Sequence, residues 1–143
     1  MNERKALTTL KHPHLNRLVQ TTKSENSIGF LLELAKGVDL YKLLKLYKTK
    51  LPSQLILCVM AQVIIALEFI HTNNWVFKDL KASHVFIDKS WRVTLIDFGM
   101  SEYFGDQDRS YLAAGTFHQM APEMIDIWET CIQKDINSHD LML

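Results

Sequence analysis

The chain contains 143 residues, of which 48% are hydrophobic and 22% are charged, and its formal net charge is zero. This length is sufficient for one domain with its own hydrophobic core. The neutral balance argues against nucleic acid or an anionic membrane surface as a binding partner.

Cysteine usage and the first residues indicate the compartment. Cys58 and Cys131 are far apart and lack the spacing of a zinc site or a disulfide framework. Residues 2–5 are polar, which is not typical of a secretory signal. The longest apolar run, residues 55–70, is expected to be too short to span a bilayer. These features predict an intracellular, cytoplasmic protein without a membrane segment.

The N-terminal residues predict a short amphipathic helix. Over residues 2–10, Leu7 and Leu10 fall on one side and charged residues on the other. The helix is expected to end before Pro13, since a residue that precedes proline avoids the helical conformation.

Four further segments follow in chain order. Apolar runs at residues 15–22 and 28–34, joined by polar residues, predict a β-hairpin. Leucines at helical spacing predict a helix over residues 40–47. Residues 52–71 predict a longer helix that begins with Pro-Ser and is apolar on nearly every face, so we expect it to be buried on all sides.

Three short segments carry the chemistry: residues 77–81 (Phe-Lys-Asp-Leu-Lys), 97–99 (Asp-Phe-Gly) and 121–123 (Ala-Pro-Glu). Asp97 follows an apolar strand, and its carboxylate offers the hard oxygen ligands that Mg²⁺ prefers. Phe98 is expected to be buried below it, and Gly99 to let the backbone reverse.

The order and spacing of these segments resemble the catalytic core of a protein kinase, with its catalytic loop, magnesium turn and activation-segment anchor. A lysine two residues after the aspartate, as in Asp79 and Lys81, resembles the catalytic loop of serine/threonine kinases. Residues 2–7 look most like the cyclic-nucleotide-dependent (AGC) subgroup. The resemblance implies a partial α+β, protein kinase-like fold, truncated at both ends. Residues 1–35 would form the end of the small lobe, and residues 36–143 the first half of the mainly helical large lobe.

The resemblance also implies catalytic roles. Asp79 would orient the substrate hydroxyl and accept its proton, Lys81 would neutralise charge on the γ-phosphate of ATP, and Asp97 would bind Mg²⁺. Thr116 would hydrogen-bond to both Asp79 and Lys81. The implied cofactors are ATP and Mg²⁺, and the implied partner is a protein substrate or another bound protein.

Other matching positions concern the nucleotide and the supporting structure. Glu3 matches the helix glutamate that pairs with a phosphate-binding lysine, although a solvated acid favoured by the helix dipole is an equal alternative. Glu123 matches the glutamate that, in the family, pairs with an arginine from a helix later in the domain. By the same resemblance, Leu32 falls at the gatekeeper position and residues 33–35 at the hinge whose backbone would bond adenine. The alternative that we favour for Leu32 and Leu34 is burial in the hydrophobic core. The residues implied in nucleotide binding are Glu33, Ala35, Asp39 and Phe86.

The sequence departs from the family in three places. Phe77-Lys78 replaces the usual His-Arg, which keeps a positive charge but loses the planar fork of arginine. His84 replaces the asparagine that ligates a second Mg²⁺, and an imidazole nitrogen suits such a hard ion poorly. No glycine-rich loop or lysine-bearing strand precedes Glu3. We therefore expect this chain alone to lack phosphotransfer activity.

Three functional hypotheses remain open. The chain is a segment of an active serine/threonine kinase, a pseudokinase or scaffold that binds partner proteins, or a non-functional truncated gene product. In the activation segment, Leu112 occupies the usual phosphorylation position, and Ser110 and Tyr111 are the nearby hydroxyl residues. Apolar faces without partners would make the isolated chain marginally stable or prone to aggregation.

Overall fold

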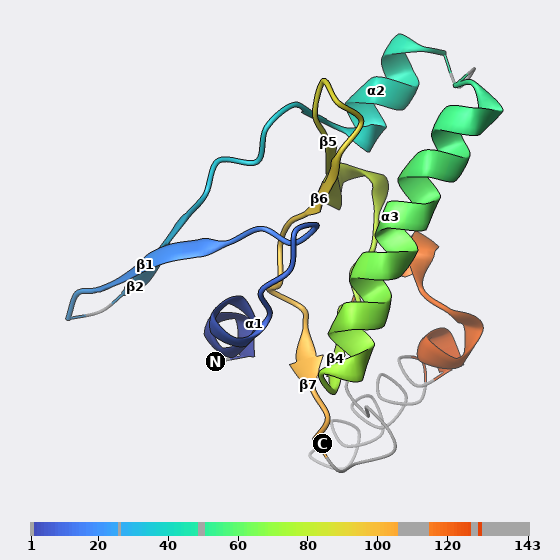
Figure 1. The fold of residues 1–143 in the computed structure, drawn as a ribbon. Coiled ribbons are helices and arrows are strands. Elements are labelled where there is room, and N and C mark those ends of the chain that lie inside the picture. The colour runs from blue at the N-terminus through green and yellow to red at the C-terminus, as the bar shows by residue number, and fades with distance from the viewer. Residues whose placement is uncertain (1, 26, 49–50, 106–114, 127–128, 130–143) are drawn as a thin grey trace, which may run out of the picture.

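The computed structural model describes residues 2–25, 27–48, 51–105, 115–126 and 129. The chain forms helices and short antiparallel strands within the described residues, which confirms the predicted α+β class (Figure 1). In chain order the elements are α1 (Asn2–Thr9), β1 (Leu18–Lys23), β2 (Ile28–Leu32), β3 (Val38–Asp39), α2 (Leu40–Leu46), α3 (Ser53–Thr72), β4 (Trp75–Val76), the 3₁₀ turn η1 (Ala82–His84), β5 (Val85–Ile87), β6 (Val93–Leu95), β7 (Glu102–Tyr103) and the 3₁₀ turn η2 (Phe117–Gln119).

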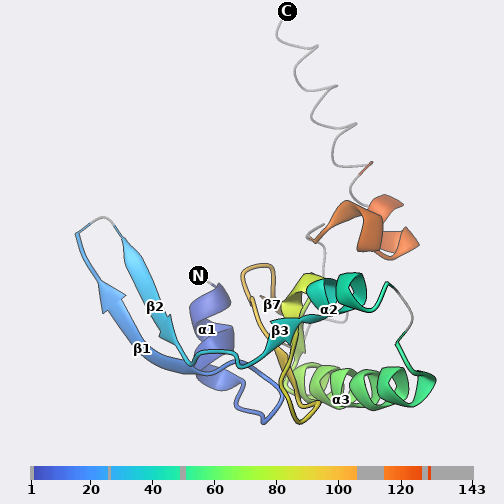
Figure 2. The ribbon, with the colours of Figure 1, turned by 90° about the horizontal axis from the view of Figure 1, so that it is seen from above.

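The N-terminal helix and the hairpin are both present. Helix α1 buries Ala6 and Leu7, which lie on its apolar side. Strands β1 and β2 pair antiparallel, with Leu18 opposite Leu32, and project away from the other elements (Figure 2). Leu34, 89% exposed, lies in the extended segment after β2, so the prediction that it belongs to the core is wrong. Leu32 is partly buried against the core, as expected.

Two small sheets organise the remaining residues. Strand β5 lies between β3 and β6, and β4 pairs with β7, all antiparallel. The segment after α1 joins the first of these sheets, because the backbone amide of Leu95 donates to the carbonyl of His14 and that of Asn16 donates to the carbonyl of Leu95. These bonds connect the N-terminal helix to the strand that leads to Asp97.

Helix α3 lies alongside the strands (Figure 1) and is joined to them by Gln62. The side-chain amide of Gln62 donates to the carbonyl of Trp91 at 2.8 Å and accepts from the backbone amide of Val93 at 3.0 Å. A polar residue inside the apolar run therefore supplies hydrogen-bond partners to two backbone groups of the β5–β6 hairpin, the carbonyl of Trp91 and the amide of Val93. This interaction explains a glutamine at a position where the pattern alone predicted only burial.

The prediction that α3 is buried on all sides is wrong. Val63 and Ile70 are 3% and 0% exposed, whereas Leu57 and Ile64 are 69% and 59% exposed. The reason is that the described elements cover one side of the helix, where β4 and β6 pack. The helix therefore presents an apolar face to solvent.

The length prediction for this segment is also wrong. Helix α3 has 20 residues, and among the described residues it is the one helix long and apolar enough to cross a membrane. Length and composition alone do not establish a membrane span, because a core helix of a soluble domain passes the same test.

Candidate active site

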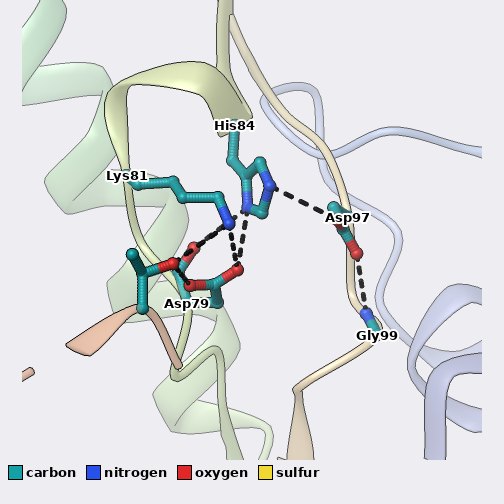
Figure 3. Close-up of polar contacts among 6 residues, drawn as sticks. Asp79, Lys81, His84, Asp97 and Gly99 are labelled. Atoms are coloured by element: carbon teal, nitrogen blue, oxygen red, sulfur yellow. Dashed lines mark hydrogen bonds and ion pairs between the residues drawn. The ribbon is translucent and has the colours of Figure 1, made fainter. Parts of the chain in front are cut away.

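Asp79 lies at the centre of a hydrogen-bonded cluster formed by the loop after β4 and the segment before η2. Its side chain is buried, and its Oδ1 accepts a hydrogen bond from the hydroxyl of Thr116 at 2.6 Å. Its Oδ2 accepts a hydrogen bond from Nζ of Lys81 at 2.7 Å (Figure 3). Lys81 also donates to the Thr116 hydroxyl at 3.1 Å. The fold thus brings together three residues separated by up to 37 positions in the sequence.

The cluster keeps Asp79 ionised. Burial alone would raise the pKa of this carboxyl group, but hydrogen bonds from Lys81 and Thr116 favour the charged form and lower the pKa below its ordinary value. The positive charge of Lys81 acts in the same direction. Asp79 is therefore a carboxylate that is oriented from two sides.

His84 lies between Asp79 and Asp97 (Figure 3). Its Nδ1 lies 3.0 Å from the carbonyl oxygen of Asp79 and 3.5 Å from Oδ2 of the same residue. Its Nε2 lies 3.3 Å from Oδ2 of Asp97. A carbonyl oxygen only accepts hydrogen bonds, so Nδ1 carries a proton and donates it. The buried imidazole thus spans the space between the two carboxylates.

The Asp97 turn differs in one detail from the expectation. The residue in the left-handed conformation is Asp97, with φ of 68°, and not Gly99. Aspartate tolerates this conformation because its short side chain bonds locally, and here Oδ1 accepts the backbone amide of Gly99 at 3.1 Å. The turn therefore directs one oxygen of Asp97 to its own backbone and the other to His84.

Aromatic packing holds the turn from below. Phe98 is 1% exposed and Phe77 is 2% exposed, and their rings meet edge to face at 5.3 Å between centroids. Leu7 of α1 is buried in the same core, and Leu18 of β1 packs against it. The predicted burial of Phe98 is confirmed, and phenylalanine at position 77 fills the core where the family has histidine.

Glu3 on α1 is half-buried, and it lies close enough to Asp97 for the charge of Asp97 to act on the Glu3 carboxyl group. Burial raises the pKa of Glu3, and the negative charge of Asp97 raises it further. A partly exposed acid in the first turn of α1 is compatible with the solvated acid that was one of the two alternatives. The pairing of Glu3 with a lysine stays a prediction.

An ion pair between Lys78 and Glu102 was not predicted. Lys78 stands directly before Asp79, and Glu102 lies on β7, where it pairs with Val76 of β4. The ammonium and carboxylate groups are in direct contact. The sequence singled out Lys78 as a weakened arginine, but Glu102 belongs to no recognisable motif, and only the pairing of β4 with β7 places it there.

The residues implied in nucleotide binding occupy two places. Glu33 forms an ion pair with Arg17 at 3.0 Å and, like Ala35, lines a polar cavity of about 240 Å³. Asp39 is the N-cap of α2 and faces Phe86 across the β3–β5 pairing. The structure therefore gives Asp39 a clear local role in starting the helix.

The remaining predicted residues lie near or outside the end of the described part. Glu123 is exposed in a helical turn at residues 122–126. Ser110, Tyr111 and Leu112 lie outside the described residues.

Comparison with known proteins gives a family and several relatives. The protein kinase domain family matches residues 1–143. The chain is 35% identical over 123 residues to a cGMP-dependent protein kinase of Toxoplasma gondii, covering 86% of this chain and 12% of that protein. It is 36% identical over 135 residues to a cGMP-dependent protein kinase of Plasmodium berghei, covering 88% and 15%.

A human relative is similar over the same part of the chain. The cAMP-dependent protein kinase catalytic subunit PRKX is 32% identical over 124 residues, covering 87% of this chain and 34% of that protein. The subgroup suggested by residues 2–7 therefore agrees with the relatives. The chain spans between about one eighth and one third of the length of these three relatives.

Proposed function

Because this chain belongs to the protein kinase family, we propose that it carries the catalytic loop and magnesium turn of a protein serine/threonine kinase in a form that does not transfer phosphate. The substrate class would be protein hydroxyl groups, and the phosphate donor of the family is ATP with Mg²⁺. Residues 1–35 and 36–143 would belong to the small and large lobes of that fold, in an intracellular protein.

Asp79, Lys81 and Thr116 would form the substrate side of the proposed site. A phosphotransfer site needs an ionised carboxylate that orients the attacking hydroxyl and a cation that compensates charge on the transferred phosphoryl group. Asp79 has the lowered pKa of such a carboxylate, and Lys81 is held against it. Thr116 fixes both through its hydroxyl. These contacts support descent from an active serine/threonine kinase.

The single observation that supports the proposed loss of phosphate transfer is the position of His84. Its ring contacts the backbone of Asp79 on one side and the carboxylate of Asp97 on the other. The imidazole therefore lies beside Asp97, the residue that would hold Mg²⁺, and offers no oxygen ligand. The family asparagine would instead present an oxygen to the ion, as hard cations require.

The residues fit the family's metal only in part. Asp97 fits a magnesium ligand, since its carboxylate oxygens are of the preferred type and half of its side chain is exposed, at 51%. His84 does not fit, because Mg²⁺ prefers oxygen ligands in octahedral geometry.

The direct test measures phosphate transfer from radiolabelled ATP to a mixed serine/threonine peptide library, with Mg²⁺ present. We compare the chain of residues 1–143 with Asp79→Asn and with Asp97→Asn, each of which removes a carboxylate. Wild type is expected to give the same background as Asp79→Asn. Transfer by wild type that disappears in Asp79→Asn and Asp97→Asn would overturn the proposal.

The role of His84 has its own readout. Equilibrium binding of MgATP is followed by calorimetry for wild type and His84→Asn, with His84→Gln as a control of similar polarity and greater length. We expect Mg²⁺-dependent binding to increase only in His84→Asn. Equal binding by wild type and His84→Asn would show that the imidazole is not the obstacle.

A second candidate function is a scaffold that binds partner proteins without transfer. The exposed apolar face of α3, which includes Leu57 and Ile64, favours this alternative over simple loss of function. Recovery of a stable, stoichiometric complex that survives Asp79→Asn would support it. A chain that neither binds a partner nor nucleotide would favour the third hypothesis, a non-functional product.

A further inference from the structure

An apolar groove is lined by residues of β3, α2, β5 and the turn between β5 and β6. Figure 1 shows α2 close to that turn. The volume of the groove is about 440 Å³, within the range of roughly 300–1,000 Å³ of sites that hold small ligands or a few side chains. Five apolar or aromatic side chains line it: Val38, Leu43, Tyr47, Ile87 and Trp91.

The floor of the groove belongs to the core, whereas its walls are open. Leu43 and Ile87 are 9% and 3% exposed, while Val38 and Tyr47 are 38% and 45% exposed. Apolar side chains left open beside a rigid floor lose solvent-exposed area when another apolar group enters. The groove therefore favours a ligand with apolar side chains.

The backbone makes this groove preformed. Gly37 has φ of 94° and passes so close to β5 that an added Cβ would lie 1.9 Å from the carbonyl oxygen of Ile87. On the other wall, Trp91 is held because its carbonyl accepts the side-chain amide of Gln62. A site that needs little rearrangement loses less free energy to ordering when it binds.

The rim of the groove is basic. Exposed lysines stand next to its two walls: Lys36 precedes Gly37, and Lys89 lies in the β5–β6 turn and lines the groove. The one acid in the lining, Asp88, directs Oδ1 to the backbone amides of Ser90 and Arg92 at 2.7 and 3.0 Å. Asp88 keeps its negative charge and balances Lys89 in the lining. Lys36 and Arg92, which line the adjoining cavity, make the surroundings of the groove positive, because Glu33 is paired with Arg17.

A second, polar cavity lies next to the groove at Asp88. It has a volume of about 240 Å³ and shares Asp88 with the groove, and Lys36 and Arg92 line it together with Glu33. Glu33 is already paired with Arg17. An elongated ligand could thus place apolar groups in the groove and anionic groups beside Lys36 and Lys89.

We propose that this groove is a docking site for an extended segment of another protein that carries apolar side chains next to acidic ones. Charge complementarity with the lysine rim selects acidic segments over basic ones, and the apolar lining supplies contact area. The interaction does not involve Asp79 or Asp97, so it stands or falls independently of phosphate transfer.

The test uses fluorescence polarisation with the whole chain, without nucleotide. The probe is a dye-labelled 12-residue peptide with two leucines, separated by one residue and followed by three glutamates. Two control peptides replace the glutamates with lysines or the leucines with serines. We expect saturable binding of the acidic-apolar peptide with a dissociation constant below about 1 mM, and clearly weaker binding of both controls.

Charge-reversal variants locate the site. Lys89→Glu is expected to weaken binding of the acidic peptide by about fivefold or more and to improve binding of the lysine peptide. The matched control, Lys23→Glu at the end of β1, changes net charge equally and should alter affinity by less than about twofold. Both lysines are exposed, so neither variant should disturb folding.

Three results would overturn the proposal. The first is the absence of saturable binding up to about 1 mM peptide. The second is equal weakening by Lys89→Glu and Lys23→Glu, which would indicate attraction to net charge alone. The third is photo-crosslinking of a benzoylphenylalanine in place of one peptide leucine to the exposed side of α3 instead of to the groove residues.

Discussion

The ammonium group of Lys78 pairs with the carboxylate of Glu102 in a largely buried contact, with the two side chains 3% and 19% exposed. Lys78 also has φ of 65°, a conformation that is unusual for a lysine. The pair joins the residue before Asp79 to strand β7, which follows the Asp97 turn. The ion pair therefore links the segment before Asp79 to the strand that follows Asp97.

Removing one member of this pair is expected to destabilise the fold strongly. Lys78→Met leaves a carboxylate without its cation in a mostly buried place, at a cost of about 3 kcal/mol in the free energy of unfolding. The double variant Lys78→Met/Glu102→Leu should recover much of that loss. Urea unfolding of both single variants and the double variant forms the cycle, and strictly additive effects would contradict the coupling.

Gly37→Ala should destabilise the fold by about 3 kcal/mol, since φ of 94° and the approach to the Ile87 carbonyl both exclude a side chain. Gly99→Ala is the matched control, because its nearest neighbour would be a side-chain oxygen of Asp97 at 3.1 Å. That variant should cost about 1 kcal/mol or less. Thermal unfolding measures both, and similar losses would refute the close approach at Gly37.

Asp39 makes the stability of the chain sensitive to acid. Burial alone would raise the pKa of Asp39, but the backbone amide of Lys42 at 2.9 Å and its ammonium group at 3.0 Å lower the pKa below the ordinary value. A lowered pKa means that the carboxylate stabilises the fold above the unfolded-state pKa of about 3.9. This contribution is lost as the pH falls through the lower, folded-state value.

The variant Asp39→Ala isolates this contribution. It removes the helix cap and should cost about 1 kcal/mol at pH 7, and the difference from wild type should shrink as the pH falls below about 4. Asp39→Asn, which keeps a capping oxygen, should lose less. Unfolding free energies at pH 7 and at acid pH give the comparison, and a difference that does not change with pH would contradict the assignment.

Thr116→Val should raise the pKa of Asp79, because it removes a hydrogen bond that stabilises the carboxylate. Thr116→Ser keeps the hydroxyl and should leave that pKa close to the wild-type value. Carbon-13 NMR of the labelled aspartate carboxyl groups follows the titration. A pKa that falls in Thr116→Val, or moves equally in both variants, would show that the 2.6 Å contact does not act on Asp79.

The exposed side of α3 should govern solubility and not stability. Leu57→Lys and Ile64→Lys are expected to reduce light scattering at high concentration and to change the free energy of unfolding by less than about 0.5 kcal/mol. Ile70→Ala, on the buried side, should cost about 3 kcal/mol. A sharp, cooperative melt of the monomeric wild-type chain would argue against the predicted tendency to aggregate.

Residue order alone was sufficient for the family and for most elements. Helical spacing of leucines, the hairpin pattern and the Asp-Phe-Gly turn are local signals, because each depends on neighbours within a few positions. The three short segments identified the kinase core for the same reason. The burial of Phe98 also followed from its own apolar character.

Contacts between distant segments could be known only from the fold. Nothing in the sequence placed Glu102 beside Lys78, since their meeting depends on the pairing of β4 with β7. The contact of His84 with both Asp79 and Asp97 likewise depends on how η1 and the Asp97 turn face each other. The apolar run of residues 52–71 shows from the sequence that α3 is apolar. Which of its faces is covered depends on the elements that pack against it, and in the described structure they cover one side.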